Sequence, residues 1–332
     1  MLLKLKRLGK AFLVVLIIVV LGLFIRIDYY VVSPSRAVEL SELIMVEGAD
    51  PDDEGTFYLV TVSQQNASLT SAAVAFLHPH MELRAADSVL PAEMDEKEYR
   101  ELLAEYMTES QHMAKVVALS EVGYDVTIIS DGVEVIGFLE DTEAADYLRE
   151  GDIIRAVDGK EVHLASEVTI LVQDRSVGDD VTLTIERDNR DVNITVPTGP
   201  GADEPEIPRI GIYIKSLPWE PVIPLDVNID TGSIGGPSAG LMFVLEIMNQ
   251  LLPQDLTGGK KIAGTGTIDL DGKVGRIGGV KQKIIAAEKA GAEYFFVPEG
   301  NMEEALTAAR DINLVPVSSL QDALSVLAEL SE

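Results

Sequence analysis

The most restrictive feature of this sequence is a glycine-rich turn that runs directly into an apolar helix. Residues 231–252 read TGSIGGPSAGLMFVLEIMNQLL. The part at 241–247 is apolar nearly all round, and a helix without a polar face has to lie inside a core. The segment therefore predicts a domain that encloses this helix. Pro237 suits the first helical position, where its missing N–H costs nothing, so we expect Ser238 in the first turn.

Ser238 has two interpretations at that position. The free N–H groups and the positive end of a helix dipole could bind a developing oxyanion beside a serine nucleophile. Serine is also common near helix starts, where it only caps the backbone. Gly-Gly-Pro-Ser alone is weak evidence for catalysis, so the choice depends on a second motif.

A second motif lies at 264–283 and reads GTGTIDLDGKVGRIGGVKQK. It predicts a strand, a tight turn, a strand and then a helix that ends at Gly291. Lys281 and Lys283 point nearly opposite ways, because each residue turns a helix by about 100°. Lys283 lies inside the apolar arc of this helix, where burial lowers the pKa of a lysine, as a neutral lysine base requires. Lys281 lies outside the arc and is expected to be a solvated surface charge.

Together the two motifs resemble the proteolytic domain of Lon proteases over roughly residues 210–327. The matching residues are GPSAG at 236–240, Thr265-Gly266, and IGGVKQK at 277–283. The resemblance implies a serine-type endopeptidase with a Ser/Lys dyad, in which Ser238 is the nucleophile and Lys283 the general base. It also implies that Thr265 lies near the lysine amine.

The chain departs from the family pattern at a few positions. Gly235 replaces an acid that many Lon proteases have, and Thr267 and Asp269 replace a glutamate and a small hydroxyl residue. Both dyad residues remain. No G-x-x-x-x-G-K-[ST] motif occurs in these 332 residues, so the expected proteolysis is independent of ATP.

Residues 123–197 have the pattern of a small β domain. Strands are expected at 126–129, 133–138, 153–157 and 181–185, with a short helix at 143–148. The stretch at 132–162, GVEVIGFLEDTEAADYLREGDIIRAVDGKEV, resembles a PDZ domain. That resemblance implies binding of a peptide C-terminus as an added strand. The candidate carboxylate-binding loop is Gly123-Tyr124-Asp125-Val126, and a turn without a ligand is the alternative.

The remaining regions complete the expected organisation. Residues 33–122 form a mixed region with a strand at 56–62 and an amphipathic helix at 96–119. The stretch at 198–208, TGPGADEPEIP, indicates a linker. Strands at 210–215 and 222–227 are assigned to the Lon-like domain, whose bounds are expected at 205–328.

Residues 1–32 are expected to be a cytoplasmic basic stub and a transmembrane anchor. The first 27 residues contain five bases and no acid, and the run at 11–25 is uncharged. As a helix this run is about 22 Å long, so Ile27 and residues 29–32 are expected to extend it. The basic end predicts a cytoplasmic N-terminus and an extracytoplasmic bulk. A cleaved signal peptide is the alternative, although no A-x-A-like site follows.

The fold class is therefore expected to be α+β/α/β, with a transmembrane helix, a PDZ-like domain and a Lon-like proteolytic domain. This order resembles the bacterial membrane-anchored PDZ/Lon-like peptidases of the YlbL type. The resemblance suggests that the strand at 56–62 belongs to the peptidase fold and that the PDZ-like domain is inserted. It implies cleavage of unfolded or flexible extracytoplasmic proteins. The alternative is an inactive peptidase fold that binds peptides through its PDZ-like domain.

Composition limits the partners. The net charge of −29 repels nucleic acid. The chain has no cysteine, and the spacing of His78 and His80 is interpreted as a surface loop, so no cofactor and no metal are expected. The expected partners are protein or peptide substrates and, through the N-terminal helix, the membrane. A hexamer is implied by the Lon resemblance alone.

Overall fold

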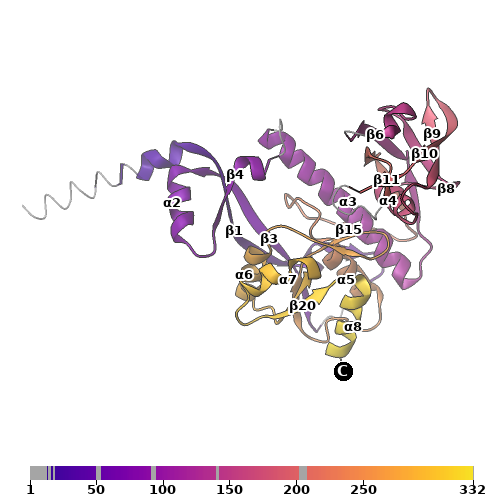
Figure 1. Ribbon diagram of the computed structural model, residues 1–332. Coiled ribbons are helices and arrows are strands. Elements are labelled where there is room, and N and C mark those ends of the chain that lie inside the picture. Colours follow the sequence, from indigo (N-terminus) through magenta and orange to yellow (C-terminus); the bar gives the residue numbers. More distant parts are fainter. Residues whose placement is uncertain are drawn as a thin grey trace, which may run out of the picture. The chain divides into compact units, whose positions relative to one another are not determined.

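The computed structural model describes Leu13, Leu16, Ile17 and residues 19–49, 54–90, 95–139, 142–201 and 208–331. The chain forms two compact units (Figure 1). The larger unit combines Met1–Tyr124 with Leu225–Glu332, and the smaller unit is Asp125–Pro224. The smaller unit is therefore an insertion into the larger one.

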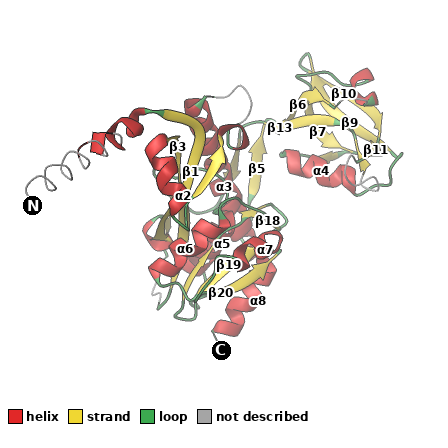
Figure 2. Ribbon diagram, turned by 60° about the vertical axis from the view of Figure 1, so that its left-hand side comes forward, coloured by secondary structure: helices red, strands yellow, loops and turns green. Residues whose placement is uncertain are grey.

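A six-stranded mixed sheet organises the larger unit, in the order β20-β19-β16-β3-β1-β4 (Figure 2). The strands are β1 (Arg26–Glu39), β3 (Thr56–Ser68), β4 (Glu82–Ala85), β16 (Lys261–Gly264), β19 (Tyr294–Pro298) and β20 (Asn313–Val317). β3, β16, β19 and β20 run parallel, whereas β1 is antiparallel to both β3 and β4. Because β3 and β16 pair across the insertion, both flanks of the chain build one sheet.

Helices cover both faces of this sheet. On one face, α6 (Val280–Ala290) and α7 (Met302–Leu306) pack on alternate strand residues that include Tyr58, Val60 and Phe295. The intervening residues Phe57 and Leu59 point to the opposite face, because strand side chains alternate. That face is covered by α5 (Gly240–Leu251), and α3 (Glu96–Val122) packs on α5.

The predicted burial of the apolar helix is confirmed, since α5 is buried from Gly240 to Gln250. The long amphipathic helix is also confirmed as α3, which ends three residues later than expected. It begins with a capping box between Asp95 and Glu98. The predicted end of α6 at Gly291 is confirmed as well, because this glycine has a φ of 79° and its N–H bonds to the last helical turn.

Short elements complete the larger unit. They are η1 (Leu40–Glu42), β2 (Ile44–Val46), α2 (Leu69–Leu77), η2 (Ala86–Ser88), β15 (Val227–Ile229), β17 (Thr267–Ile268), β18 (Val274–Gly275), η4 (Glu299–Asn301) and α8 (Leu320–Leu330). β2 pairs with β15, and β17 pairs with β18.

The smaller unit contains a sheet in the order β10-β9-β7-β6-β13, with β8 paired to β7. Its elements are β5 (Thr127–Ser130), β6 (Val133–Phe138), η3 (Glu143–Asp146), β7 (Ile153–Val157), β8 (Lys160–Glu161), α4 (Ala165–Gln173), β9 (Asp180–Arg187), β10 (Arg190–Pro197), β11 (Gly199–Pro200), β12 (Pro208–Arg209), β13 (Ile212–Ser216) and β14 (Trp219–Val222). The apolar faces of this sheet and of α4 form a separate core.

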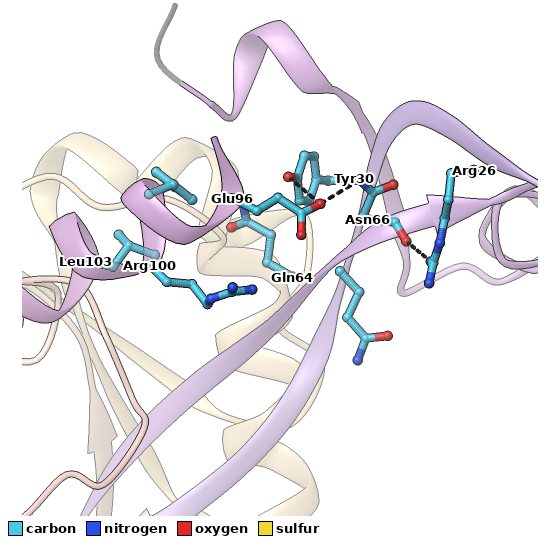
Figure 3. A pocket seen from close by; sticks show the side chains of 9 residues that line it. Arg26, Tyr30, Gln64, Asn66, Glu96, Arg100 and Leu103 are labelled. Atoms are coloured by element: carbon cyan, nitrogen blue, oxygen red, sulfur yellow. Dashed lines mark hydrogen bonds between the residues drawn. The ribbon is translucent and has the colours of Figure 1, made fainter. Parts of the chain in front are cut away.

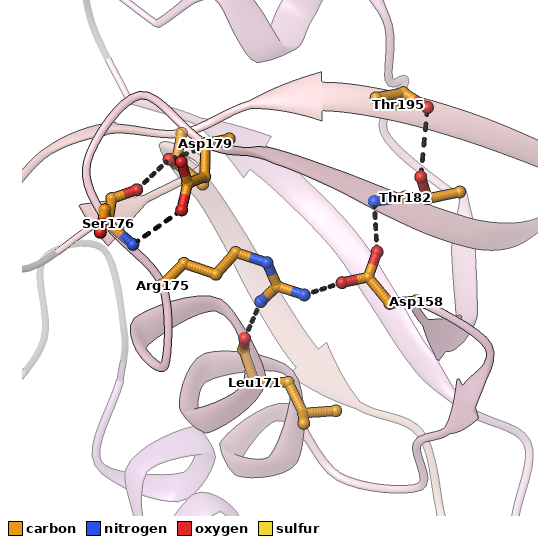
Figure 4. A network of polar contacts seen from close by, with 8 residues as sticks. Asp158, Leu171, Arg175, Ser176, Asp179, Thr182 and Thr195 are labelled. Carbon is orange, nitrogen blue, oxygen red and sulfur yellow. Dashed lines mark hydrogen bonds and ion pairs between the residues drawn. The ribbon is translucent and has the colours of Figure 1, made fainter.

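Hydrogen bonds and an ion pair connect the end of α4 to the sheet of the smaller unit (Figure 4). Arg175, just after α4, donates to the Leu171 carbonyl and to the Asp158 carboxylate. Asp158 also accepts from the Thr182 N–H of β9 at 2.9 Å. The turn after β7, the end of α4 and β9 are thereby linked, so the position of α4 on the sheet is fixed.

Two expected boundaries differ in the structure. The strand at 210–215 does form as β13, but it pairs with β6 inside the smaller unit and does not join the Lon-like region. The strand expected at 222–227 does not form: residue 222 ends β14, residue 227 begins β15, residues 223–226 are not in a strand, and β14 and β15 lie in different units. A strand-forming pattern predicts an extended segment but does not encode its pairing partner. The helix α4 was not predicted, and residues 202–207 of the expected linker lie outside the described residues.

The expected extension of the anchor is also corrected. β1 begins at Arg26, so Ile27 and residues 29–32 form a strand, and Val31 and Val32 are buried in it. Their β-branched and aromatic side chains favour a half-buried strand over a helix. In the described part of the chain no helix is both long and apolar enough to cross a membrane. Residues 1–12, 14, 15 and 18 of the expected stub and anchor lie outside the described residues.

Candidate active site

Ser238 lies in the turn that leads into α5. The turn contains Gly236, whose φ of 91° favours glycine, and its N–H bonds to the Leu103 carbonyl of α3 at 2.7 Å. α5 begins at Gly240, so the expectation of Ser238 inside the first helical turn is corrected by two residues. The Ser238 carbonyl accepts instead from the Gly266 N–H, at 2.9 Å, so it does not start the helical ladder.

Lys283 and Thr265 come to Ser238 from two other elements. Thr265 follows the carboxyl end of β16, and Lys283 lies in the first turn of α6. The lysine Nζ is 2.7 Å from Ser238 Oγ and 2.8 Å from Thr265 Oγ1. The Thr265 hydroxyl in turn donates to the Ser238 carbonyl at 2.9 Å. The structure therefore brings together all three residues that the sequence motifs singled out.

Burial dominates the electrostatics of Lys283. This residue is only 3 % exposed, and it belongs to the buried part of α6, together with Val280 and Ala287. Desolvation disfavours the ammonium form and lowers the lysine pKa from 10.5 to about 7. The alternative lysine, Lys281, is half-buried rather than fully solvated as expected. Its charge lowers the pKa of the Glu82 carboxyl, after the larger effect of Arg84.

Two backbone N–H groups next to the nucleophile are available to a ligand. Among the described residues, neither the Ser238 N–H nor the Ala239 N–H has a hydrogen-bond acceptor. Both precede the first turn of α5, where the helix dipole is positive. Such a pair of donors has the chemistry needed to bind an oxyanion.

Supporting contacts from distant segments were not predicted from sequence. Ser110 of α3 is 6 % exposed and donates to the Pro237 carbonyl at 3.2 Å. Asn301 makes two hydrogen bonds to the backbone of Ile277, at 2.9 and 3.0 Å, and so fixes the turn before α6. Ser110 lies in an amphipathic helix and Asn301 at the end of η4, so neither has a sequence signal beyond being polar.

Ser238 and Lys283 line an open cavity of about 790 Å³. One wall is β3, from Leu59 to Gln64, and another is α3. β16 pairs with β3 only as far as Leu59, and in the described part of the chain no strand continues along that side. The unpaired stretch of β3 therefore offers main-chain groups to an extended segment beside the dyad.

The smaller unit has the elements of a peptide groove at a different place from the one expected. Gly123 ends α3 in the larger unit, so the segment Gly123–Val126 does not lead into the edge strand of the smaller unit's sheet. The prediction that this segment is the carboxylate-binding loop is therefore corrected. β13 is the edge strand that has α4 beside it, and the Ala165 N–H of α4 donates to Ser216 of β13 at 2.9 Å. The segment that leads into this edge strand contains Gly211, whose φ is 82°.

Comparison with known families agrees with both units. Residues 225–329 match the model of the Lon protease (S16) C-terminal proteolytic domain, and residues 120–198 match that of the PDZ domain. Among curated proteins, the Lon protease of Mycolicibacterium smegmatis is 25 % identical over 319 residues, which is 90 % of this chain and 38 % of that protein. The Lon protease of Mycoplasma pneumoniae is 37 % identical over 106 residues, covering 30 % of this chain and 13 % of that protein.

The chain spans 11 % to 38 % of the length of the Lon proteases that it is similar to. A solved PDZ domain of an SdrC-like protein from Listeria monocytogenes is 26 % identical, covering 26 % of this chain and 92 % of that one, with a TM-score of 0.24.

Proposed function

We propose that this protein is an ATP-independent serine endopeptidase, with Ser238 as nucleophile and Lys283 as base. The chain joins a segment that matches the Lon-type proteolytic domain to one that matches the PDZ domain. The observation that carries this proposal is the 2.7 Å separation of Lys283 Nζ and Ser238 Oγ inside the Lon-type segment. The buried lysine has a pKa of about 7, so a large neutral fraction exists at physiological pH. Serine hydroxyls need such an adjacent base to act as nucleophiles.

The reaction follows from the positions of the donors and acceptors. Neutral Lys283 accepts the Ser238 hydroxyl proton while Oγ attacks the scissile carbonyl carbon. The carbonyl oxygen becomes an oxyanion, which the N–H groups of Ser238 and Ala239 would bind. The lysine ammonium then gives its proton to the leaving amine, and the C–N bond breaks to leave an acyl-enzyme. Water, deprotonated by Lys283, hydrolyses the ester and restores the serine.

Thr265 orients the base in this scheme. Its hydroxyl hydrogen is committed to the Ser238 carbonyl, so its lone pairs face the lysine amine. One lysine N–H therefore points at Thr265, which leaves the nitrogen lone pair free for Ser238. A group held in this way loses less entropy when it reaches the reactive geometry.

The substrate has to be extended where it meets the dyad. A chain laid along the unpaired stretch of β3 would add a strand to the sheet, which a folded region cannot do without unfolding. No P-loop is present in the sequence to drive unfolding. We therefore assign unfolded or flexible protein segments as substrates, with the groove between β13 and α4 binding their C-termini.

Two matched substrates test this function. Both are the same unfolded reporter protein, one ending in a free carboxylate and the other in an amide. Without ATP, the full-length protein is expected to cleave both, and the free-carboxylate form several-fold faster at low concentration, because the β13 groove recruits it. Mass spectrometry of the fragments gives the rates. Equal rates would contradict C-terminal capture, and a requirement for ATP would contradict the proposed activity.

We also propose that the N-terminal run holds the protein at a membrane, with its bulk on the extracytoplasmic side. The run at 11–25 is uncharged, and residues 55–81 also contain no Asp, Glu, Lys or Arg in a chain of net charge −29. This second stretch includes α2, on which Phe76 and Leu77 are 88 % and 81 % exposed. The Thr70 hydroxyl of α2 donates to the Val19 carbonyl, so α2 begins beside the end of the apolar run.

Single-cysteine labelling tests this placement, because the chain has no native cysteine. Labels at Leu16→Cys and Phe76→Cys in vesicle-bound full-length protein are expected to be quenched by lipid-borne quenchers and protected from iodide. A label at Tyr213→Cys, in the exposed part of β13, is the aqueous control. Iodide access to position 16 equal to that at 213 would contradict an anchor. In intact cells an impermeant maleimide is expected to label position 213, and labelling only after lysis would contradict the extracytoplasmic placement.

Assembly into a hexameric ring is implied only by the resemblance to Lon proteases and stays a prediction. The mass of the detergent-solubilised protein tests it.

A further inference from the structure

The cavity at the dyad continues into a second cavity along the same two elements. The second cavity has a volume of about 390 Å³ (Figure 3). Gln64 of β3 and Tyr99 and Leu103 of α3 line both cavities. Together the cavities follow β3 from Leu59 to Asn66, a length of about 25 Å for a strand. We call this continuous path between β3 and α3 the substrate groove.

The charge of the substrate groove is opposite to that of the chain. The chain has 55 acids and 26 lysines and arginines. Among the described residues, the lining of the two cavities contains five basic side chains, Arg26, Arg36, Arg84, Arg100 and Lys283, and one acid, Glu96. A lining drawn at random from this composition would contain more acids than bases. The reversal therefore marks a local positive field on a negative protein.

Three of these arginines form no ion pair with a described acid, and one of them, Arg26, donates instead to the Asn66 carbonyl at 3.0 Å. Arg84 is bound by both oxygens of Glu82, at 3.0 Å each, so this pair is neutral overall. No described acid forms an ion pair with Arg36 or Arg100. Arg36 and Arg100 therefore lie on the groove with unpaired guanidinium groups.

The surrounding contacts explain why these two cations stay unpaired. Glu96 lies one helical turn before Arg100, yet its carboxylate accepts from Asn66 at 2.7 Å and from the Tyr30 hydroxyl at 3.4 Å. Figure 3 shows the Arg100 side chain extending from α3 into the cavity. Arg36 lies at a register shift of β1, where its backbone N–H and C=O both bond to the Thr61 hydroxyl of β3. Such irregularities redirect side chains relative to a regular strand.

We infer that the substrate groove selects segments that carry acidic side chains near the scissile bond, bound by Arg36 and Arg100. This inference deepens the proposed peptidase function and rests on it. An unpaired guanidinium binds a carboxylate through two parallel N–H donors, a geometry that a neutral amide of the same shape cannot reproduce. Glutamate is therefore favoured over glutamine at the positions that face Arg36 and Arg100. Because both arginines flank β3, the preferred residues lie on the segment that β3 pairs with.

Paired peptides test this selection in the full-length protein. The parent is an internally quenched peptide that the protein cleaves and that is blocked at both ends. At each position next to the scissile bond, one peptide carries Glu and its partner carries Gln. Blocking both ends removes terminal carboxylates, so only side chains are compared. We expect kcat/KM for Glu over Gln to be about fivefold at one or more positions, the effect of a partly exposed ion pair. The difference should lie mainly in KM.

Variants separate local binding from net charge. Arg36→Gln and Arg100→Gln are each expected to bring the Glu/Gln ratio close to one at the position they face. Arg190→Gln, an exposed arginine of β10 in the smaller unit, changes the net charge equally and should keep the ratio. A parent ratio of one at every position, or a ratio that survives in both groove variants, overturns the inference.

A binding measurement keeps the inference testable if turnover fails. Fluorescence anisotropy of the same peptides on the Ser238→Ala protein is expected to give about fivefold tighter binding of the Glu form, lost in the Arg36→Gln and Arg100→Gln backgrounds. Equal binding of the two forms overturns the acidic preference. Tighter Glu binding without any cleavage by the parent protein would leave the preference standing and contradict the peptidase function, so the two failures are distinguishable.

Discussion

Replacement of Ser238 by alanine is expected to lower the rate of peptide cleavage by the full-length protein at least about 10³-fold. Without Oγ there is no atom to form the acyl-enzyme, and Lys283 has no hydroxyl to deprotonate. Time courses of fragment formation by mass spectrometry, without ATP, measure the loss. The background rate that remains comes from binding and the backbone N–H donors alone.

A matched control removes a serine hydroxyl elsewhere. Ser325→Ala in α8 deletes a hydroxyl that bonds only within its own helix. This variant should cleave at the parent rate. Ser238→Ala should also keep the fold, because its Oγ is half-buried and contacts Lys283, whose second hydrogen bond to Thr265 persists. Retention of more than about a tenth of the parent rate in Ser238→Ala would contradict the assigned nucleophile.

The activity is expected to rise with pH through about 7 and then level off. Only neutral Lys283 can accept the serine proton, and burial lowers the pKa of this lysine to about 7. Below that pH, kcat/KM should fall about tenfold per pH unit, since the neutral fraction does. Lys283→Met should lower kcat/KM by 10² to 10⁴, the usual contribution of a general base, as a rough range. A flat profile between pH 5 and 9 would exclude Lys283 as the base.

The same pKa has a consequence for stability that does not depend on catalysis. The folded-state pKa lies below the value of 10.5 in an unfolded chain, so between about pH 7 and 10.5 the unfolded state binds more protons. The free energy of unfolding should therefore rise with pH in that window relative to Lys283→Met, by up to about 1.4 kcal/mol per pH unit. Below pH 7 both states are protonated and the difference should be constant. Urea unfolding of the two proteins at several pH values measures it.

Elements with a strong local signal could be predicted from the sequence. The all-round apolar pattern of α5, the amphipathic pattern of α3 and the glycine after α6 each specify their own structure. The choice of Lys283 over Lys281 also follows from helical geometry, because only one of the two falls on the apolar arc. In the structure Lys283 is 3 % exposed, whereas Lys281 keeps intermediate exposure.

Features that depend on distant partners could not be predicted. β13 has an ordinary strand pattern, and only its pairing with β6 shows that it belongs to the smaller unit. Ser238 lies before α5 because the end of β16 competes for its carbonyl, a contact between residues far apart in sequence. The carboxylate-binding loop was assigned to Gly123–Val126 because that segment precedes a strand, but the sheet edge with α4 beside it follows residue 211.

The Ser238/Lys283 dyad is tested most directly by trapping the acyl-enzyme. Full-length protein is mixed with an activated peptide ester, quenched in acid and mapped by mass spectrometry. We expect one acyl group on Ser238, formed at a rate that rises through pH 7 and is nearly abolished in Lys283→Met. An acyl group on another residue, or none on Ser238 at any pH, would contradict the dyad and favour an inactive peptidase fold that binds peptides.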